Sequence, residues 1–186
     1  MLEHKGTKLL ETKRLILRQF KIEDYTEMYN NWACEDIVTK FLTWPTHANS
    51  SITKSILEDW TEKYKNNDFY NWAIELKEEN KIIGNISVVN YKEESLSAIL
   101  GYCMGSKWWG QGIMAEAGKE VVKFLFEEVK FNRIAADHDK NNPNSGKVMQ
   151  KIGMKYEGTL RSAGVNNQGI IDEVWYSILR NEWKNN

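Results

Sequence analysis

The chain contains the stretch Lys107-Trp-Trp-Gly-Gln-Gly-Ile-Met-Ala-Glu-Ala117, in which two glycines stand one residue apart at the start of an amphipathic helix. Apolar residues recur at three- and four-residue spacing over 113–129, and residues 96–104 just upstream are typical of a strand. Glycine lets the main chain approach a ligand closely, and the first turn of a helix offers free N–H groups and the positive end of the dipole. The strand, glycine loop and helix therefore predict a phosphate site.

One ligand of such a unit is a nucleoside triphosphate. Gly105 and Gly110 have the glycine spacing of the Gly-x-x-x-x-Gly-Lys-Ser/Thr loop, but Gln111 and Gly112 stand where the lysine and the hydroxyl are needed. Without a lysine for the outer phosphates or a magnesium ligand, the pattern argues against a triphosphate.

A second ligand is a nicotinamide dinucleotide, because Gly110-x-Gly112-x-x-Ala115 satisfies the Gly-x-Gly-x-x-Gly/Ala fingerprint. Here, however, Gly110 lies beyond a connecting segment rather than in a tight turn off the strand. The acidic residues about twenty positions on, Glu127 and Glu128, still belong to the helix instead of ending a second strand. A nicotinamide-dependent oxidoreductase is therefore a weaker alternative.

The third ligand is coenzyme A. The run 107–112 resembles the Gln/Arg-x-x-Gly-x-Gly/Ala pyrophosphate motif of the GNAT superfamily of N-acetyltransferases, with Lys107 in place of the usual Gln or Arg. Four further segments follow the order of the RimJ/RimL-type branch and resemble its opening strand, its Asn-x-x-Ser helix, the strand entry after that helix and its final strand: 11–18, 142–145, 148–154 and 172–180. The chain is identified as a member of this branch, which acetylates ribosomal-protein N-termini and other amines.

The hydrophobic pattern predicts an α+β fold. Helices are expected at 22–32, 52–64, 113–129 and 143–152, and strands at 15–20, 69–76, 82–91, 96–104, 132–138, 154–160 and 170–179. Residues 36–49 are expected to be irregular. The last two strands are expected to form a hairpin across 161–169, whose Gly, Ser and Asn content is typical of a mobile loop. We expect a central mixed, mostly antiparallel sheet with helices on both faces. The GNAT resemblance adds a splayed strand pair to this sheet.

Composition and charge place the chain among ordinary globular proteins. It has 186 residues, 41% hydrophobic and 27% charged, and a net charge of −1. We expect one GNAT domain over 1–186, with neither nucleic acid nor a membrane as partner.

Two cysteines, Cys34 and Cys103, lie far apart without metal-like spacing, so neither a disulfide framework nor a metal site is indicated. No stretch approaches the roughly 20 apolar residues that cross a bilayer, and none has the character of a signal segment. We expect a cytoplasmic protein.

Acetyl transfer from a thioester to an amine needs a neutral amine, a stabilised oxyanion and a proton for the departing thiolate. By resemblance, acetyl-CoA is the cosubstrate and its phosphates bind the main chain of Gly110, Gln111, Gly112, Ile113 and Met114. Lys107 would add positive charge there. The pantetheine arm would run beside the strand end formed by Tyr102, Cys103 and Met104, where a main-chain N–H would face the thioester oxygen.

Asn142 and Ser145 are the side chains that the resemblance brings to the chemistry. Asn142 would bond the pantetheine amide, and Ser145 would protonate the sulfur. The alternative is structural, because Asn142 is a good N-cap before Pro143, Ser145 suits a first turn, and Gly153 suits the end of the helix.

The general base is not marked by a motif. His138 at a strand end is a candidate, together with Glu75 and the pair Asp172 and Glu173. Many GNAT members carry a glutamate just before the Gly-Tyr of the strand preceding the glycine loop, and here that position is Leu100. This departure favours a water relay or a base elsewhere.

Trp44 and His47 are candidates for the acceptor pocket, with a packing aromatic and a surface histidine as the alternative. We also expect Trp108 or Trp109 to pack under the loop or against the ligand. Cys103 has no paired base and is not predicted to be a nucleophile.

The predicted activity is N-acetyl transfer from acetyl-CoA to a primary amine, either a protein N-terminus or a small molecule, by direct attack through a tetrahedral intermediate. A non-catalytic CoA-binding module or sensor is the rival from another class. Such enzymes are often dimers, so a homodimer is the expectation for assembly.

Overall fold

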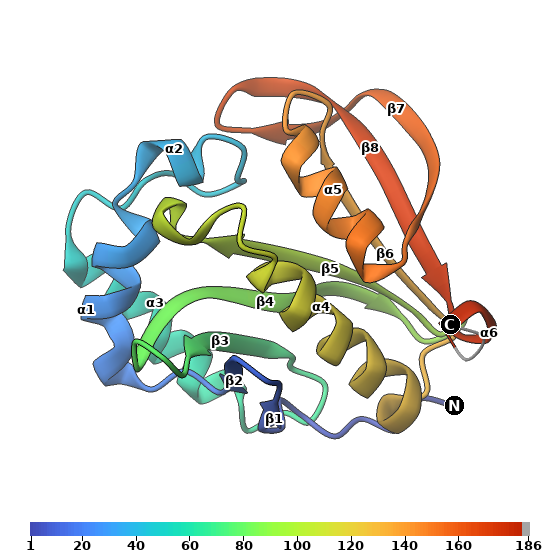
Figure 1. Cartoon of the computed structure of the whole chain (residues 1–186), viewed down its shortest axis with the longest axis horizontal. Helices are drawn as coiled ribbons and strands as arrows, with labels where there is room; N and C mark the ends of the chain where they lie inside the picture. The colour runs from blue at the N-terminus through green and yellow to red at the C-terminus, as the bar shows by residue number, and fades with distance from the viewer. Residues whose placement is uncertain (184–186) are drawn as a thin grey trace.

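The computed structural model describes residues 1–183, which fold round a sheet of eight strands (Figure 1). The spatial order is β1-β2-β3-β4-β5-β6-β8-β7, and all neighbours run antiparallel except β5 and β6. The strands are β1 (Leu10–Glu11), β2 (Leu15–Arg18), β3 (Asn71–Leu76), β4 (Lys81–Lys92), β5 (Ser97–Met104), β6 (Arg133–Asp139), β7 (Lys155–Asn166) and β8 (Gly169–Leu179). The predicted α+β class and mostly antiparallel sheet are confirmed.

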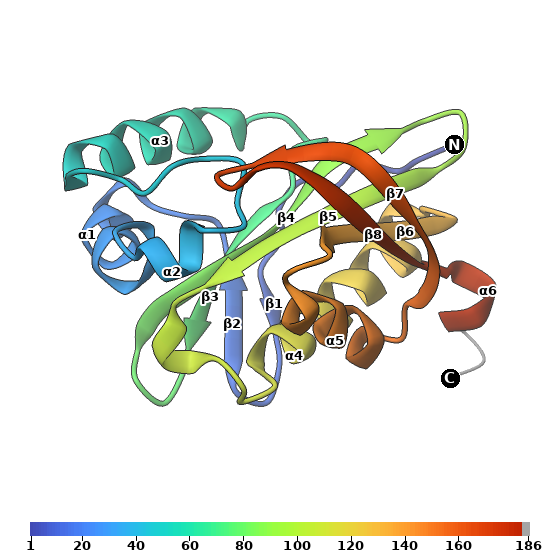
Figure 2. The ribbon, with the colours of Figure 1, turned by 90° about the horizontal axis from the view of Figure 1, so that it is seen from above.

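Helices cover both faces of this sheet. The first three α-helices lie on one face, and α4 and α5 lie on the other (Figure 2). The α-helices are α1 (Tyr25–Met28), α2 (Asp36–Thr39), α3 (Ser50–Lys63), α4 (Ile113–Phe124), α5 (Pro143–Ile152) and α6 (Arg180–Trp183). Short 3-10 segments are η1 (Ile22–Asp24) and η3 (Ser106–Trp108), and π turns are η2 (Tyr29–Ala33) and η4 (Leu125–Val129). The expected helices 22–32 and 113–129 therefore form with changes of helix type along their length.

The parallel pair β5 and β6 is short and then splays. It is paired only from Ser97 opposite Arg133 to Ile99 opposite Ala135. On the other edge of β5, the Gly105 N–H donates to the Ile83 carbonyl in β4 at 2.9 Å. The main-chain N–H and C=O groups of successive strand residues point to opposite edges. Those of Tyr102 and Met104 therefore point away from β4, towards the gap between β5 and β6. The splayed pair expected from the resemblance is therefore present.

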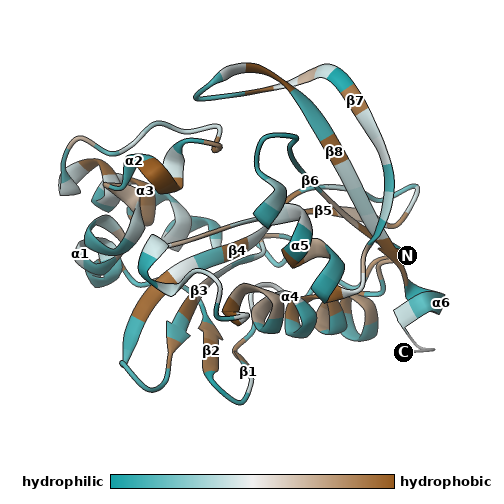
Figure 3. Cartoon of the chain, turned by 45° about the horizontal axis from the view of Figure 1, so that its top comes forward, coloured by the Kyte–Doolittle hydropathy of each residue, from teal (hydrophilic) through white to brown (hydrophobic). Residues whose placement is uncertain are grey.

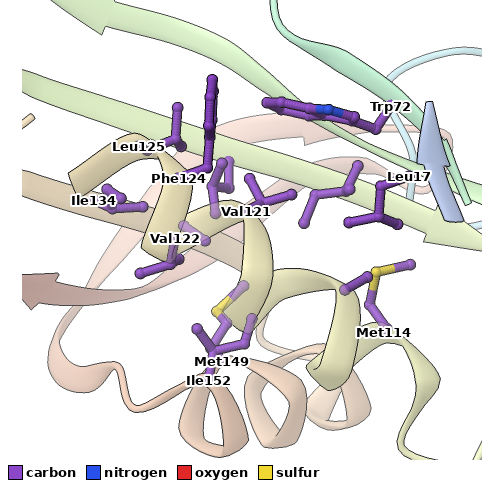
Figure 4. Close-up of a cluster of buried hydrophobic side chains, with 14 of the residues drawn as sticks. Leu17, Trp72, Met114, Val121, Val122, Phe124, Leu125, Ile134, Met149 and Ile152 are labelled. Atoms are coloured by element: carbon purple, nitrogen blue, oxygen red, sulfur yellow. The ribbon is translucent and has the colours of Figure 1, made fainter. Parts of the chain in front are cut away.

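Helix α4 sits at the centre of the larger core. In Figure 3 β2 and β3 are mostly hydrophobic, and α4 alternates hydrophobic and hydrophilic residues round its circumference. Figure 4 shows Trp72 and Leu17 of the sheet on one side of α4, and Met149 and Ile152 of α5 on the other. A second cluster, containing Trp32 of η2, fills the space between the sheet and helices α1 and α3.

The prediction of a mobile loop over 161–169 is wrong. Strand β7 continues to Asn166 and β8 begins at Gly169, so the turn between them is only two residues long. The Gly and Ser content reflects a break in register between Leu160 and Gly164, where Ser162 adopts a positive φ of 51°. Such irregularity bends a hairpin without ending it.

The tip of this hairpin is anchored. The main-chain N–H of Asn167 donates to the Leu42 carbonyl, and its side-chain amide donates to the carbonyls of Thr39 and Trp44. Those acceptors lie in the 36–49 segment, which was expected to be irregular and contains one helical turn, α2. Over residues 1–183, none of the helices combines the length and apolar character that crossing a bilayer requires.

We expect Phe124→Ala to destabilise the fold by about 3–5 kcal/mol, because it removes a large side chain from a close-packed core. Phe124 is 3% exposed and its ring meets Trp72 edge-on at 5.7 Å. Urea unfolding followed by circular dichroism measures the effect. Lys123→Ala, at an exposed position on the same helix, is the matched control and should change stability by less than about 0.5 kcal/mol.

Candidate functional site

The gap between β5 and β6 opens into a cleft of about 460 Å³. Four segments form its walls: the α2 region, the end of β5, the glycine loop with the first turn of α4, and the loop and first turns of α5. The cleft therefore connects the face covered by α4 and α5 with the face covered by α1 to α3.

The glycine loop meets the requirements of an anion site. Gly110 and Gly112 have φ values of +78° and +73°, which L side chains rarely adopt, and nothing lies within 4 Å of a Cβ placed on Gly110. The first helical hydrogen bond of α4 runs from the Glu116 N–H to the Gly112 carbonyl, and no side chain caps this end. The N–H groups of residues 113–115 therefore have no partner within the helix and line the cleft.

An ion pair that sequence reasoning missed supports this loop. Arg14 donates from Nε to Glu116 Oε2 at 2.6 Å and from Nη1 to the Gln111 carbonyl at 3.0 Å. Glu116 also accepts from the Thr12 hydroxyl. Burial acts to raise the pKa of Glu116, but the hydrogen bonds from Thr12 and Arg14 outweigh it and the pKa is lowered. In the sequence, only the acidic residue in the first turn of α4 could have pointed to this ion pair. Its partner Arg14 is distant in the sequence and is brought to it by the fold.

The residues flanking the glycines divide between the inside and the outside of the cleft. Trp108 is buried beneath the loop, and Trp109 lines the cleft with its Nε1 donating to the Met104 carbonyl at 2.7 Å. Lys107 points away from the cleft and pairs with Glu79 at 3.0 Å. Gln111 is exposed and does not line the cleft. The geometry therefore assigns neither Lys107 nor Gln111 a side-chain role at the phosphate position.

Tyr102 and Ser145 meet across the open end of the gap. The Tyr102 hydroxyl lies 2.9 Å from Ser145 Oγ and donates to the Ser145 carbonyl at 3.0 Å. Burial raises the pKa of Tyr102, and the nearby charge of Asp137 raises it further, while the hydrogen bond with Ser145 opposes them. Tyr102 is therefore a neutral phenol in the cleft, able to donate a proton through Ser145.

Asn142 stands at the N-cap position of α5, as predicted, with Pro143 next and Gly153 in a left-handed conformation at the other end. Its side chain makes no capping hydrogen bond. Asn142 and Ser145 both line the cleft, so the amide of Asn142 is available to a ligand there.

Cys103 lines the cleft as a protonated thiol. Its Sγ donates to Asn85 Oδ1 at 2.9 Å, and burial raises its pKa to about 12. A thiolate is the nucleophilic form of cysteine, so this environment makes Cys103 a poor nucleophile near neutral pH.

His138, the candidate base, lies beneath α5 rather than in the cleft. Its Nδ1 donates to the Asp139 carbonyl at 2.7 Å, and its ring stacks on Tyr176 at 5.9 Å. A Cβ placed on Gly146 would come within 2.6 Å of Nε2, so the helix covers the other ring nitrogen closely. This packing matches a structural histidine.

The candidates for the acceptor pocket also lie outside the cleft. Glu75 accepts from Arg18 Nε at 2.7 Å in an ion-pair network on β2 and β3. His47 is buried with its Nδ1 2.7 Å from the Thr53 hydroxyl, and Trp44 packs against its ring. Burial lowers the pKa of His47, consistent with a neutral packed ring. The α2 region instead supplies the apolar lining at this end: Ile37, Val38, Phe41 and Leu42.

Asp137 was not among the candidates from the sequence. It is half-buried on β6, just beyond the last residue paired with β5. Burial and then the charge of Glu173 raise the pKa of Asp137 to about 6. Asp137 is not itself a lining residue of the cleft, but a carboxyl with a shifted pKa next to the strand gap is a candidate for a functional role. Over residues 1–183, no three His, Cys, Asp or Glu side chains converge as a metal site would require.

The comparisons with known proteins agree with this geometry. The family described as the acetyltransferase (GNAT) domain matches residues 14–155. The uncharacterized N-acetyltransferase YnaD of Bacillus subtilis is 27% identical over 94% of this chain and 98% of its own length. The [ribosomal protein uS5]-alanine N-acetyltransferase of Escherichia coli is 30% identical over 57% of this chain and 55% of its own.

A solved structure shows the same fold. The crystal structure of the microcin C7 self-immunity acetyltransferase MccE, in complex with acetyl-CoA and AMP, superimposes with a TM-score of 0.82 over 90% of this chain and 93% of that one, at 22% identity. At this identity the likeness concerns the fold.

We expect Asp137→Asn to stabilise the protein above pH 6 and to leave it nearly unchanged below pH 4. The ordinary pKa of this carboxyl, 3.8, is raised to about 6 in the fold, so the folded state binds the proton more tightly than the unfolded chain. The wild type therefore loses stability as pH rises between these values. With allowance for solvent screening of a half-buried group, the gain is about 1–2 kcal/mol at pH 8.

Urea unfolding of both proteins at pH 4, 6 and 8 measures this difference. Asp59→Asn, on the exposed face of α3, makes the same chemical change where Asp59 pairs only with Lys63 at the surface. It should show no comparable gain. An Asp137→Asn protein that is less stable than the wild type at pH 8 contradicts the raised pKa.

Proposed function

Because the chain belongs to the GNAT acetyltransferase domain family, whose members are acyl-CoA-dependent N-acetyltransferases, we propose that it transfers the acetyl group of acetyl-CoA to a primary amine by direct attack through a tetrahedral intermediate. The observation that carries the proposal is the cleft itself. It joins free helix N–H groups at one end to a hydrogen-bonded Tyr102 and Ser145 at the other. Family membership also decides against the nicotinamide-dependent alternative.

The glycine loop supports the first role, binding of the pyrophosphate. The free N–H groups of Ile113, Met114 and Ala115 sit at the positive end of the α4 dipole, which favours a dianionic group. The pantetheine arm then lies along the end of β5, where the main chain at 102 and 104 has no strand partner on the β6 side. Asn142 bonds an amide of this arm.

The same strand end supports the second role, stabilisation of the oxyanion. An N–H group of Tyr102 or Met104 directed into the gap is a fixed donor for the oxygen that becomes negative during attack. The C–S bond then breaks and the thiolate takes a proton from the Ser145 hydroxyl, which Tyr102 restores. A thiol pKa near 8.5 makes this a modest demand on the acid.

The acceptor is a primary amine from one of two sources. One is a protein N-terminus, supported by the likeness to an enzyme named for alanine of ribosomal protein uS5. The other is a small amine, which the enclosed volume of the cleft accommodates. A single domain over 1–186, a cytoplasmic location and a homodimer stay predictions from the sequence.

Acetyl transfer is tested by incubating the protein with acetyl-CoA and a panel of amines, including alanine- and serine-initiated peptides, spermidine and lysine. Free CoA is measured by thiol detection and the acetylated product by mass spectrometry. Product formation with an amine supports the proposal. A protein that binds acetyl-CoA and acetylates none of the panel supports the non-catalytic CoA-binding module instead.

We expect Gly112→Ala to weaken acetyl-CoA binding by about tenfold, because an alanine at a φ of +73° costs roughly 1–2 kcal/mol and strains the loop whose main chain would hold the pyrophosphate. Isothermal titration calorimetry measures the affinity. Gly158→Ala is the control, since Gly158 lies on β7 without a positive φ and nothing lies within 4 Å of its added Cβ. Equal affinities for the two variants would refute the placement of the pyrophosphate.

Tyr102→Phe and Ser145→Ala should each lower kcat by about tenfold with little change in the affinity for acetyl-CoA. This is below the usual range for general acid catalysis because the thiolate leaves readily. The double variant should lose little more than either single one, since both changes break one hydrogen-bonded relay. Multiplicative losses would show that the two hydroxyls act independently.

A further inference from the structure

The two ends of the cleft lie on opposite faces of the sheet. Leu100, Met104 and Ala136 belong to the core on the α4 side, whereas Cys103 belongs to the cluster between the sheet and α1 to α3. The glycine loop and the first turn of α5 approach from the α4 side. An acceptor must therefore reach the thioester from the other face, where the α2 region lines the cleft.

Asp137 points towards this second face. Its neighbours on β6, Ala136 and His138, point to the α4 and α5 side, one into the core and the other beneath α5. Side chains alternate along a strand, so Asp137 points the opposite way. It lies two residues beyond Ala135, the last β6 residue paired with β5. Asp137 is thus the first side chain on the acceptor face where the two strands have separated.

A second carboxylate on the same face adds negative charge. Glu173 lies on β8, where it pairs with Asp139, and Trp175 pairs with Asp137, so all four side chains share one face. Glu173 is held by the Trp175 Nε1, which donates to it at 3.0 Å. Asp139 is buried and satisfied by the side chain of Asn166.

Among these acids, Asp137 alone accepts no hydrogen bond from another residue of the described chain. Within residues 1–183, no lysine, arginine or histidine forms an ion pair with Asp137 or Glu173. The groups coupled to Asp137 are Glu173 from β8 and the neutral Tyr102 from β5. A half-buried carboxylate beside another negative charge is unfavourable unless a cation joins it. Lys40, which lines the cleft at the α2 region, forms no ion pair with either acid, so the charge of Asp137 and Glu173 is left for a ligand to neutralise.

We propose that Asp137 binds the acceptor as a protonated primary amine and is the general base that removes its proton, while Glu173 positions and tunes this carboxylate. The proposal rests on the proposed function and names the acceptor class, a cationic primary amine.

The proton count follows from this assignment. The ammonium gives one proton to Asp137, the free amine attacks the thioester carbon, and the new C–N bond forms. Collapse of the intermediate breaks the C–S bond, and the nitrogen releases a second proton. One proton equivalent ends on the sulfur of CoA through Ser145 and the other reaches solvent, so the products are the amide, CoA and one proton.

The test compares kcat/KM of the wild type, Asp137→Asn, Glu173→Gln and Asp59→Asn between pH 5 and 9.5, with an alanine-initiated peptide and spermidine as probes. We expect Asp137→Asn to lose about 100-fold at pH 7, within the range for a general base. The deficit should shrink towards pH 9.5, because an α-amine with a pKa near 8 is then neutral in solution. Affinity for acetyl-CoA should not change.

The shape of the pH profile separates a catalytic role from a structural one. The wild-type rate should rise through pH 6, and Asp137→Asn should lose that limb. Glu173→Gln should move the limb to lower pH, because it removes the neighbouring negative charge, and Asp59→Asn should leave it in place. An Asp137→Asn enzyme with the wild-type rate and profile overturns the inference while acetyl transfer stands.

A second measurement decides the matter if the wild type acetylates neither probe. Each probe, and the N-acetylated form of the peptide, is titrated into the CoA-bound protein by calorimetry. The ammonium site is supported if the free amine binds, the N-acetylated peptide does not, and Asp137→Asn weakens the binding of the free amine tenfold or more. Absence of binding, or binding that Asp137→Asn leaves unchanged, overturns it.

Discussion

The separation of β5 from β6 after three paired residues is the constraint on which the rest of the molecule depends. A sheet normally satisfies its main-chain groups through neighbouring strands, and here one parallel pair stops early in the interior of an eight-stranded sheet. The unpaired strand edge is polar, lies between two cores and stays open to both faces. Helix α4 enters from one side with its own unpaired N–H groups, so the two irregularities provide the polar surface of one cleft.

Packing explains why the gap does not close. Helix α4 is held between the sheet and α5, with Trp72 above it and Ile152 below (Figure 4). A Cβ on Gly118 would come within 2.3 Å of the Ile152 side chain, so the glycine lets this side chain of α5 pack directly on the main chain of α4. Both helices are therefore fixed relative to β6, and their N-termini stay at the mouth of the gap.

Most of the fold could be predicted from local patterns. The amphipathic period of α4, the alternation in β2 to β5 and the Pro143 and Gly153 signals of α5 are properties of short segments, and they placed these elements within a few residues. The β7–β8 hairpin was also predicted, but its outer part was not, because the local sequence around Ser162 and Gly164 is typical of a loop. Their strand state depends on pairing with β8 and on bonds from Asn167 to a distant segment.

The site was predictable where main chain and local motif define it, and less so where side chains meet across the fold. The glycines, Asn142 and Ser145 all line the cleft. Lys107 pairs with Glu79, and His138 stacks on Tyr176 beneath α5, and both contacts join residues that are far apart in the sequence. Asp137 carries no motif. Its raised pKa depends on its burial and on Glu173 of β8, and its position depends on where β6 stops pairing with β5. Only the sheet topology reveals these contacts.

The anchored tip of the β7–β8 hairpin ties two distant parts of the chain together. Three hydrogen bonds from Asn167 join the hairpin to the end of α2 and to the segment that follows it. At about 0.5–1.5 kcal/mol each, these bonds stabilise the contact by roughly 3 kcal/mol. Because the α2 region also lines the cleft, a substitution at the hairpin tip would be felt at a wall of the site that it does not touch.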